Sequence, residues 1–411
     1  MRIGEFAQKH NITQDTVRHY LDLGLLVTEK NGGQYDFSEV DSHDLMQIME
    51  LKKLNFSLNE AQKILTIQRI SGSNTNTFRN LYLTFLEDKK KEVDSKLLKY
   101  NKFDELLKDK IKEIKSTEIK NIKRIGFPLS SLHLLVCPEC QAVLKLSEGT
   151  IEEDNIMDAN LKCSCGYEAV IQNGVFINKS SIKTKMLYGK KMLTKEEYLA
   201  CSSYNYNNFI YKGMNAIIEF INKYENEPKY ILEMDNCVGF FLLQYIKYLP
   251  KDSVYILIDY DIERINKLKL DLEMYYDHKN FIFLCCDYDN LPIKKSSMDI
   301  LIDYCMLRNY EDSTGKQLFE KALPLMKSDG IITGSYYYLG QSSNKKIMSE
   351  KIRNKYSKNT YIEKFNKFNL KMLSSSDIGP TLVESTFNND FKGIKEVELF
   401  QSIYVCKKTL G

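Results

Sequence analysis

Four cysteines occur as two close pairs in the middle of the chain. Cys137 and Cys140 are separated by two residues, and Cys163 and Cys165 by one. Each pair can lie on a tight turn, so that four thiolates converge on one tetrahedral ion, the geometry that zinc adopts with sulfur ligands. Because four thiolates leave no open coordination position, the pattern predicts a structural metal rather than a catalytic one. Unligated thiols are the alternative interpretation.

The residues around these cysteines resemble a zinc ribbon. Cys137-Pro138-Glu139-Cys140 matches the first knuckle of such a module, whereas Cys163-Ser164-Cys165 is one residue shorter than the usual second knuckle. Three short apolar runs predict its strands: Val143–Leu146, Asn160–Lys162 and Val175–Ile177. We expect a module of this size to fold only weakly without its metal.

Acidic residues stand at the ends of predicted strands in the C-terminal half. Glu233 lies in the first strand, Asp259 ends the second, and Asp287 follows the third. The carboxyl ends of parallel strands share one edge of a sheet, where backbone amides and helix N-termini also approach a ligand. Asp259 is placed to accept hydrogen bonds from ribose hydroxyls. Asp287 is placed to accept one from an adenine amine, with Tyr288 packed on the ring.

Strands and helices alternate around these acids, which predicts a mostly parallel sheet with helices on both faces. The predicted strands are Tyr230–Met234, Val254–Ile258, Phe281–Cys285, Ile300–Tyr304 and Gly330–Tyr336, with paired edge strands in Val397–Val405. The predicted helices are Phe240–Tyr248, Ile262–Tyr275 and Lys316–Met326, after a mainly helical stretch at Ser181–Glu227.

This region, about Tyr230–Tyr338, resembles the class I S-adenosylmethionine-dependent methyltransferases. The resemblance implies a Rossmann-like fold in which Glu233, Gly239, Asp259, Asp287 and Tyr288 contact S-adenosylmethionine. Only one of the family's three first-loop glycines is retained. The other two positions hold Asp235 and Cys237, whose side chains obstruct the methionine end of the cofactor. No catalytic constellation stands out, and ordinary loop acids are the alternative interpretation.

The N-terminal stretch Met1–Leu26 predicts two short helices joined by a tight turn. Thr13 is a suitable N-cap for the second helix, and Gly24 follows that helix where a left-handed residue is needed. Short strands at Leu25–Thr28 and Gln34–Phe37 flank an Asn-Gly-Gly turn. Two further helices start at the capping patterns Ser38/Asp41 and Ser57/Glu60.

This order of elements resembles the DNA-binding domain of the MerR family of transcription regulators. The resemblance lies in Ile3–Ala7, Thr16–Tyr20, Gly24–Leu26, Gly33–Tyr35 and Leu54–Leu58. It implies that the second helix enters the major groove of double-stranded DNA at a promoter palindrome. The residues implied in DNA contact are Gln14, Thr16, Arg18, Tyr20 and Tyr35. Asp36 stands where the family usually has an arginine.

Thr75–Lys115 contains almost no helix breaker and carries an imperfect apolar stripe. So long a helix cannot bury its stripe in a small domain, and it usually pairs with another helix. MerR-like proteins place an antiparallel dimerisation helix here, which implies a homodimer. A helix packed on its own chain is the alternative.

The whole chain has 411 residues, a net charge of +3, a hydrophobic fraction of 43% and no run apolar enough to span a membrane. We expect a cytoplasmic, multidomain protein. The expected parts are a winged helix-turn-helix (1–70), a dimerisation helix (71–118), a linker (119–132), a zinc ribbon (133–178) and an α/β methyltransferase-like domain (179–411).

Three functions are compatible with this organisation. The first is a dimeric regulator whose C-terminal part senses a small-molecule effector or binds an adenosyl ligand. The second is an active methyltransferase acting on RNA or a small metabolite, with an autoregulatory DNA-binding domain. The third is a C-terminal scaffold for a protein partner.

Overall fold

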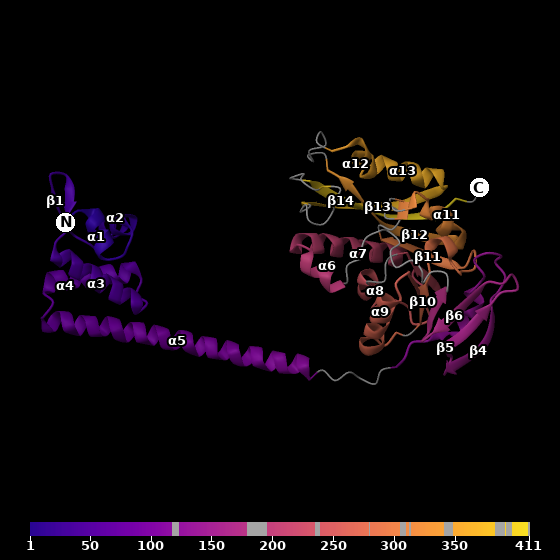
Figure 1. Ribbon diagram of the computed structural model, residues 1–411, viewed down its shortest axis with the longest axis horizontal. Coiled ribbons are helices and arrows are strands. Elements are labelled where there is room, and N and C mark those ends of the chain that lie inside the picture. The colour runs from indigo at the N-terminus through magenta and orange to yellow at the C-terminus, as the bar shows by residue number, and fades with distance from the viewer. Residues whose placement is uncertain are drawn as a thin grey trace. The chain divides into compact units, whose positions relative to one another are not determined.

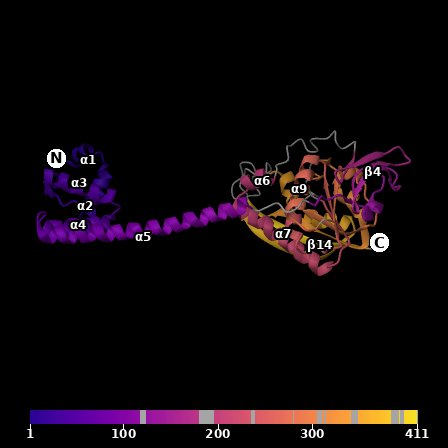
Figure 2. The same cartoon turned by 90° about the horizontal axis from the view of Figure 1, so that it is seen from below.

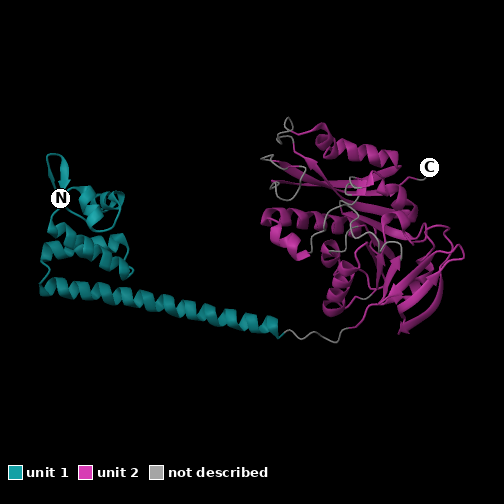
Figure 3. Ribbon diagram, in the orientation of Figure 1, with its two compact units in different colours: residues 1–118 teal, residues 119–411 magenta. Residues whose placement is uncertain are grey.

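The computed structural model describes residues 1–116, 123–178, 195–234, 239–278, 280–304, 310–311, 314–340, 348–382, 391 and 397–409. The chain divides into two compact units, residues 1–118 and 119–411 (Figure 3). Within the described ranges no helix is both long and apolar enough to cross a bilayer. The five-part division expected from the sequence remains a prediction.

The N-terminal unit is helical with one hairpin (Figure 1). Its elements are α1 (Ile3–Lys9), α2 (Gln14–Asp22), β1 (Glu29–Asn31), β2 (Gln34–Asp36), α3 (Glu39–Lys53), α4 (Leu58–Ser71) and α5 (Asn76–Lys115). The Thr13 hydroxyl accepts from the Thr16 amide at 3.1 Å, and both predicted capping boxes form. The predicted strand at Leu25–Thr28 is wrong. Gly32 and Gly33, both with positive φ, make a two-residue turn that pairs Asn31 with Gln34 instead.

The helix α5 has two different halves. Its first turns contribute Phe78, Tyr82, Phe85 and Leu86 to the core of the N-terminal unit. Lys89, which is buried, fixes this half to α4 through an ion pair with Glu60 at 2.8 Å, and it also pairs within α5 with Glu92 at 2.7 Å. The second half carries exposed apolar side chains: Val93, Leu97, Leu98, Tyr100, Phe103, Leu106, Leu107, Ile111 and Ile114. The stripe expected from the sequence is therefore covered only over its first part.

The C-terminal unit is built on one twelve-stranded sheet, counted over the described residues, with the order β13-β14-β12-β11-β8-β9-β10-β7-β6-β5-β3 and β4 paired to β5. The strands are β3 (Phe127–Pro128), β4 (Lys145–Glu152), β5 (Asn155–Lys162), β6 (Glu168–Gln172), β7 (Val175–Asn178), β8 (Tyr230–Glu233), β9 (Val254–Asp259), β10 (Phe281–Cys285), β11 (Met298–Tyr304), β12 (Met326–Leu339), β13 (Leu370–Leu382) and β14 (Glu398–Lys408).

Strands β8 to β12 are parallel, as the alternating pattern predicts, and the unit is a mixed α/β domain. Helices α7, α8 and α9 contribute to the core on one face of the sheet, and α11 and α13 to the core on the other. Figure 1 labels all five helices, and Figure 2 shows α7 and α9 from below. The described helices are α6 (Lys195–Cys201), α7 (Tyr204–Tyr224), α8 (Phe240–Tyr245), α9 (Ile262–Tyr275), α11 (Leu318–Ala322), α12 (Glu350–Lys355) and α13 (Lys358–Lys367), with 3₁₀ turns at Leu129–Leu134 (η1), Tyr288–Asn290 (η3) and Leu323–Leu325 (η4).

Two details of the sheet differ from the expectation. The predicted edge pair in Val397–Val405 is a single strand, β14, which lies inside the sheet between β12 and β13. The strands of the cysteine-containing ribbon also continue the large sheet, because β7 pairs in parallel with β10. The ribbon is thus a short segment of the chain, but backbone hydrogen bonds join it to the main sheet.

Candidate functional site

The outer face of α2 is where the sequence places most of the DNA contacts. Gln14 and Arg18 are exposed, and the Thr16 hydroxyl shares a 2.8 Å hydrogen bond with Thr13. Arg18 Nη1 forms an ion pair with Asp15 at 2.8 Å, one turn earlier on the same exposed face. The pair lies in water and can exchange for a phosphate or a base edge at little cost.

The two tyrosines predicted to contact DNA have different environments. The ring of Tyr20 is buried in the core, and its hydroxyl accepts a hydrogen bond from Lys52 Nζ at 3.4 Å. Tyr35 is half-buried on β2, with Lys30 Nζ 4.7 Å from its ring centroid. The neighbouring carboxylate of Asp36 accepts from the amine of Met1 at 2.9 Å, and this hydrogen bond lowers the pKa of Asp36.

The four cysteines converge as their spacing predicts. Their Sγ atoms all lie within 4.8 Å of one another, with Cys137 buried and the others at the surface or half-buried. Short turns position them: the Cys137 amide donates to Ala142 O at 2.8 Å, and the Cys163 amide donates to Tyr167 O at 2.9 Å. A hydrogen bond from the Cys165 backbone lowers the pKa of Cys163 to about 6. Cys163 can therefore be a thiolate near neutral pH, whereas its hydrogen bonds with neighbouring thiols raise the pKa of Cys140 and Cys165.

The carboxyl edge of the sheet carries the predicted acids. The strand order reverses between β8 and β11, and ligands of open α/β sheets bind at such a switch point. Glu233 is buried at the end of β8, where Tyr255 donates to it at 2.6 Å, and burial raises the pKa of Glu233 to about 7. Asp259 at the end of β9 is buried 3.6 Å from Arg264 Nη1, a partner that the sequence did not reveal.

The remaining predicted contacts lie around this edge. Asp287 uses Oδ1 to accept from the amides of Asp289 and Asn290, both at 3.0 Å. The Tyr288 ring is buried edge-on against Tyr310, with the centroids 6.0 Å apart. Gly239 has φ +71°, and a Cβ there would lie 2.5 Å from a Leu268 methyl, so glycine is required. The first-loop residues Asp235 and Cys237 lie outside the described residues.

Tyr167 reaches this edge from the ribbon, and sequence reasoning did not single it out. It follows the second cysteine pair and packs against the core that contains Cys286, Tyr288 and Cys137. Its hydroxyl is buried with no hydrogen-bond partner among the described residues. Burial raises the pKa of Tyr167, and negative charge on its surroundings, including the Asp287 carboxylate, adds to the rise. The only signal in the sequence is an aromatic residue next to a metal knuckle.

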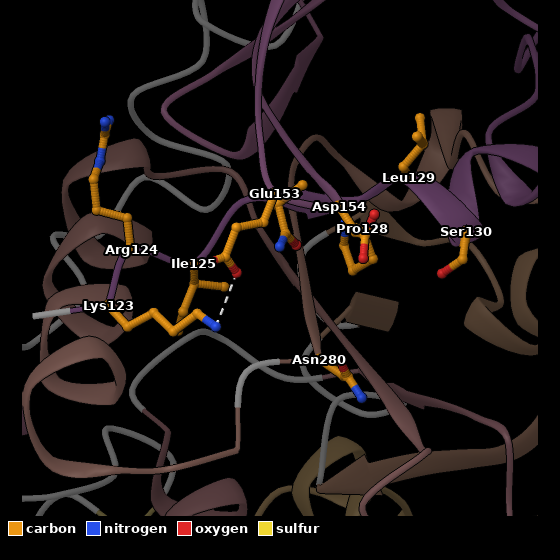
Figure 4. Close-up of a pocket in the computed structure, with 10 residues that line it drawn as sticks. Lys123, Arg124, Ile125, Pro128, Leu129, Ser130, Glu153, Asp154 and Asn280 are labelled. Atoms are coloured by element: carbon orange, nitrogen blue, oxygen red, sulfur yellow. Dashed lines mark ion pairs between the residues drawn. The ribbon is translucent and has the colours of Figure 1, made fainter.

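A cavity of about 620 Å³ lies elsewhere in this unit. It is lined by residues of the segment 123–130, by the turn between β4 and β5, and by Asn280. Figure 4 shows that it is polar, with Lys123 paired to Glu153 across 2.9 Å. Arg124 pairs with Glu152 at 2.8 Å, and the Ile125 amide donates to Glu273 of α9 at 2.7 Å. Its charges are thus largely neutralised by one another, and the lining favours no particular ligand.

The comparisons with known proteins divide along the two units. Residues 1–67 match the model of the MerR HTH family regulatory proteins. The HTH-type transcriptional regulator HmrR of Rhizobium leguminosarum bv. viciae is 29% identical over 98 residues, 24% of this chain and 73% of that protein. The mercuric resistance operon regulatory protein of Bacillus cereus is 30% identical over 97 residues, 23% of this chain and 72% of that protein.

Solved structures similar to the chain include two of interest. The MccD protein has a TM-score of 0.38 and 12% identity, covering 47% of this chain and 96% of its own. A SAM dependent methyltransferase from Aquifex aeolicus has a TM-score of 0.35 and 10% identity, covering 52% of this chain and 99% of its own.

Proposed function

This chain belongs to the MerR family, and from that premise we propose that it is a homodimeric, cytoplasmic transcription regulator that binds a promoter palindrome. The observation that carries the proposal is the family match over residues 1–67. The family implies DNA binding, with α2 as the helix that enters the major groove. We propose Gln14, Thr16 and Arg18 on α2, the hydroxyl edge of Tyr20, and Tyr35 on the wing as the DNA contacts.

The charge of the DNA-binding domain supports a dimer. Residues 1–70 contain ten acidic and eight basic side chains, so bulk attraction to phosphates is weak. A single domain then has few cations with which to hold DNA. Two domains linked rigidly bind both half-sites of a palindrome, and the second contact becomes intramolecular. Dimerisation therefore supplies affinity that charge does not.

The exposed half of α5 supports the same conclusion. Its apolar side chains follow alternating steps of four and three residues, except that Asp104 holds the position between Tyr100 and Leu107: Val93, Leu97, Tyr100, Leu107, Ile111 and Ile114. This heptad spacing makes a seam that another helix covers by knobs-into-holes packing. Leu97 is 57% exposed and Leu107 is 63% exposed, so within the described part of this chain nothing covers the seam. A second copy of α5 is the occupant that we propose.

Two charged residues on the same seam favour an antiparallel pair. Lys90 and Asp104 occupy heptad positions between the apolar ones. In a parallel pair each would face its own copy, which sets like charges together. In an antiparallel pair centred between Leu97 and Tyr100, Lys90 comes within one helical turn of Asp104 from the second copy. This register places opposite charges across the seam, in addition to the ion pairs that Lys90 and Asp104 form within α5 with Asp94 and Lys108.

In this proposal the ribbon and the sheet edge bind the ligands that regulate DNA binding. Zinc is the metal that best fits four converging thiolates in tetrahedral reach, and it would hold the two knuckles together. At the switch point, Asp259 and Asp287 accept hydrogen bonds from ribose hydroxyls and an adenine amine. Glu233 and Gly239 line the first turn. An adenosyl ligand such as S-adenosylmethionine, whose sulfonium is cationic, suits this acidic edge.

Catalytic methyl transfer is the second candidate, and it rests on the same retained acids. RNA as its acceptor is disfavoured by the ribbon, because residues 133–178 hold seven acidic side chains and two lysines. A surface of that sign repels a phosphate backbone. A small-molecule acceptor is therefore the form of this candidate that the charges allow.

The DNA-binding assignment is tested with Arg18→Ala. An operator is first obtained by selecting tight binders from random DNA with the full-length protein. We expect the substitution to weaken operator binding by about a hundredfold, because each half-site loses a contact worth about 1–3 kcal/mol. Asp15→Ala is the matched control: it breaks the same ion pair but removes a negative charge, so binding is unchanged or tighter. Equal weakening in both variants would mean that the ion pair only stabilises α2.

The ligand assignment is tested by titrating S-adenosylmethionine into the intact protein, free and bound to its operator. Micromolar binding with a changed operator affinity supports an effector role. Binding that leaves operator affinity and transcription unchanged rejects the coupling. Transfer of the methyl group in an acceptor screen would favour the second candidate.

A further inference from the structure

The Tyr167 hydroxyl is buried, and no described residue forms a hydrogen bond with it. A buried hydroxyl without a partner costs about 1–3 kcal/mol, and such groups are rare in native proteins. The side chain comes from the ribbon and packs, partly buried, against the core cluster that includes Cys286 and Tyr288, where the charges of Cys286 and Asp287 act on it. Its position thus brings a hydrogen-bond donor from one module to the ligand edge of another.

The ribbon is fixed tightly enough to hold this donor in place. Strand β7 pairs with β10, the strand that leads into Asp287. On the far side of the first knuckle, the Val136 amide donates to Pro292 O at 3.1 Å and the Lys294 amide donates to Leu134 O at 2.8 Å. Residues on both sides of Asp287 are therefore hydrogen-bonded to the ribbon. The backbone of Tyr167 is in turn bonded to Cys163.

Asp287 presents the complementary group. Its Oδ1 is used by the turn that follows, whereas Oδ2 has no hydrogen bond among the described residues and is not sealed from solvent. Counted over the described residues, Asp287 thus provides a carboxylate acceptor and Tyr167 a hydroxyl donor without a partner. Adenine carries the matching pair on its Watson–Crick edge, an amine donor and a ring-nitrogen acceptor. Guanine and hypoxanthine present a carbonyl in place of the amine.

We propose that Tyr167 is an adenine-recognition residue, donating its hydroxyl to a ring nitrogen while Asp287 accepts from the amine. The inference rests on the proposed adenosyl site and adds a role for the ribbon. The metal module forms one wall of the ligand site, so that metal loading and ligand affinity are coupled through Tyr167. Specificity for the base then depends on a residue outside the parallel sheet.

The test compares S-adenosylhomocysteine with S-inosylhomocysteine, using the zinc-loaded, full-length protein in calorimetric titrations. The two ligands differ only at the base. We expect the wild-type protein to prefer the adenosyl form by at least about tenfold. Tyr167→Phe removes one hydroxyl, and we expect about threefold to tenfold weaker binding of the adenosyl form. Zinc content and thermal unfolding show whether the variant retains its ribbon.

Tyr248→Phe is the matched control, because its ring is half-exposed on the segment after α8. It should bind both ligands as the wild-type protein does. Equal affinities of the Tyr167→Phe variant and the wild type would overturn the inference and leave the adenosyl site standing. Binding of neither ligand by the wild type would reject the adenosyl site and the inference with it. Removal of zinc should lower wild-type affinity and leave the already weakened Tyr167→Phe variant less affected.

Discussion

The ribbon and the second half of α5 are both too small to be stable alone, yet they are completed in different ways. The ribbon joins the main sheet through β7 and β10 and places Cys137 in a shared core. The end of α5 keeps its apolar seam exposed within the described part of the chain. The ribbon buries its apolar side chains within its own chain. The seam of α5 stays exposed, which indicates that a second copy covers it.

Breaking the α5 seam should have the largest effect. Leu97→Glu combined with Leu107→Glu should give a monomer, because each buried leucine contributes about 1.5–3 kcal/mol and a dimer loses every one twice. Sedimentation equilibrium measures the mass, and operator affinity should fall with it. Leu98→Glu is the control: it lies beside the seam, is 72% exposed and should leave a dimer. A dimer that survives the double substitution would contradict the proposed seam.

Removing zinc tests the other half of the comparison. We expect chelation to open the two knuckles and lower the unfolding temperature, while the amides of β7 and β10 stay protected by their pairing. Hydrogen exchange resolves the two regions. Cys140→Ser should reproduce the effect, and Cys201→Ser, an exposed thiol on α6, should not. Unchanged exchange around the cysteines after chelation would exclude a structural metal.

Reversing the seam charges should have an intermediate effect on dimer affinity, and this effect distinguishes an antiparallel from a parallel pair. Lys90→Asp or Asp104→Lys alone should weaken the dimer by about tenfold, since each places like charges together. The double exchange should restore the dimer if the helices run antiparallel. Restoration would not occur in a parallel pair, where each charge still meets its own copy.

The junction of α4 with α5 should show the smallest effect. The hydrogen bond from Lys89, with help from the Ser57 amide, lowers the pKa of Glu60 to about 2. A lowered carboxyl pKa stabilises the fold above the unfolded value near 4.5, and that contribution is lost as pH falls toward 2. Glu60→Gln should lower the unfolding temperature by a few degrees at pH 7 and not at pH 2. Glu92→Gln, the other partner of Lys89, should change it less, and a pH-independent difference would contradict this account.

The features that sequence reasoning predicted are local. Capping residues bond within three positions, so the helix starts at Thr13, Ser38 and Ser57 follow from the side chains present. The convergence of the four cysteines and the parallel core strands also follow from spacing and apolar runs. Such features need no knowledge of distant partners.

The features that it missed depend on distant partners. Strand β13 is polar and contains a proline, so it lacks a strand pattern, yet it pairs with the apolar β14 at the sheet edge. The pairing of β7 with β10 joins segments far apart in the chain. Tyr167 and Arg264 acquire their positions only after these contacts form. Their residue types alone carry no such information.

The union of ribbon and sheet also has a consequence for solubility. Strand β10 is apolar throughout and buried on both faces. Without β7 it would be an open edge, with unpaired amides and carbonyls beside the side chains of Phe281–Cys285. Such an edge templates pairing with other chains and leads to aggregation. The ribbon thus shields the sheet, and a fragment that begins at α6 should precipitate where one that begins before β3 stays monodisperse.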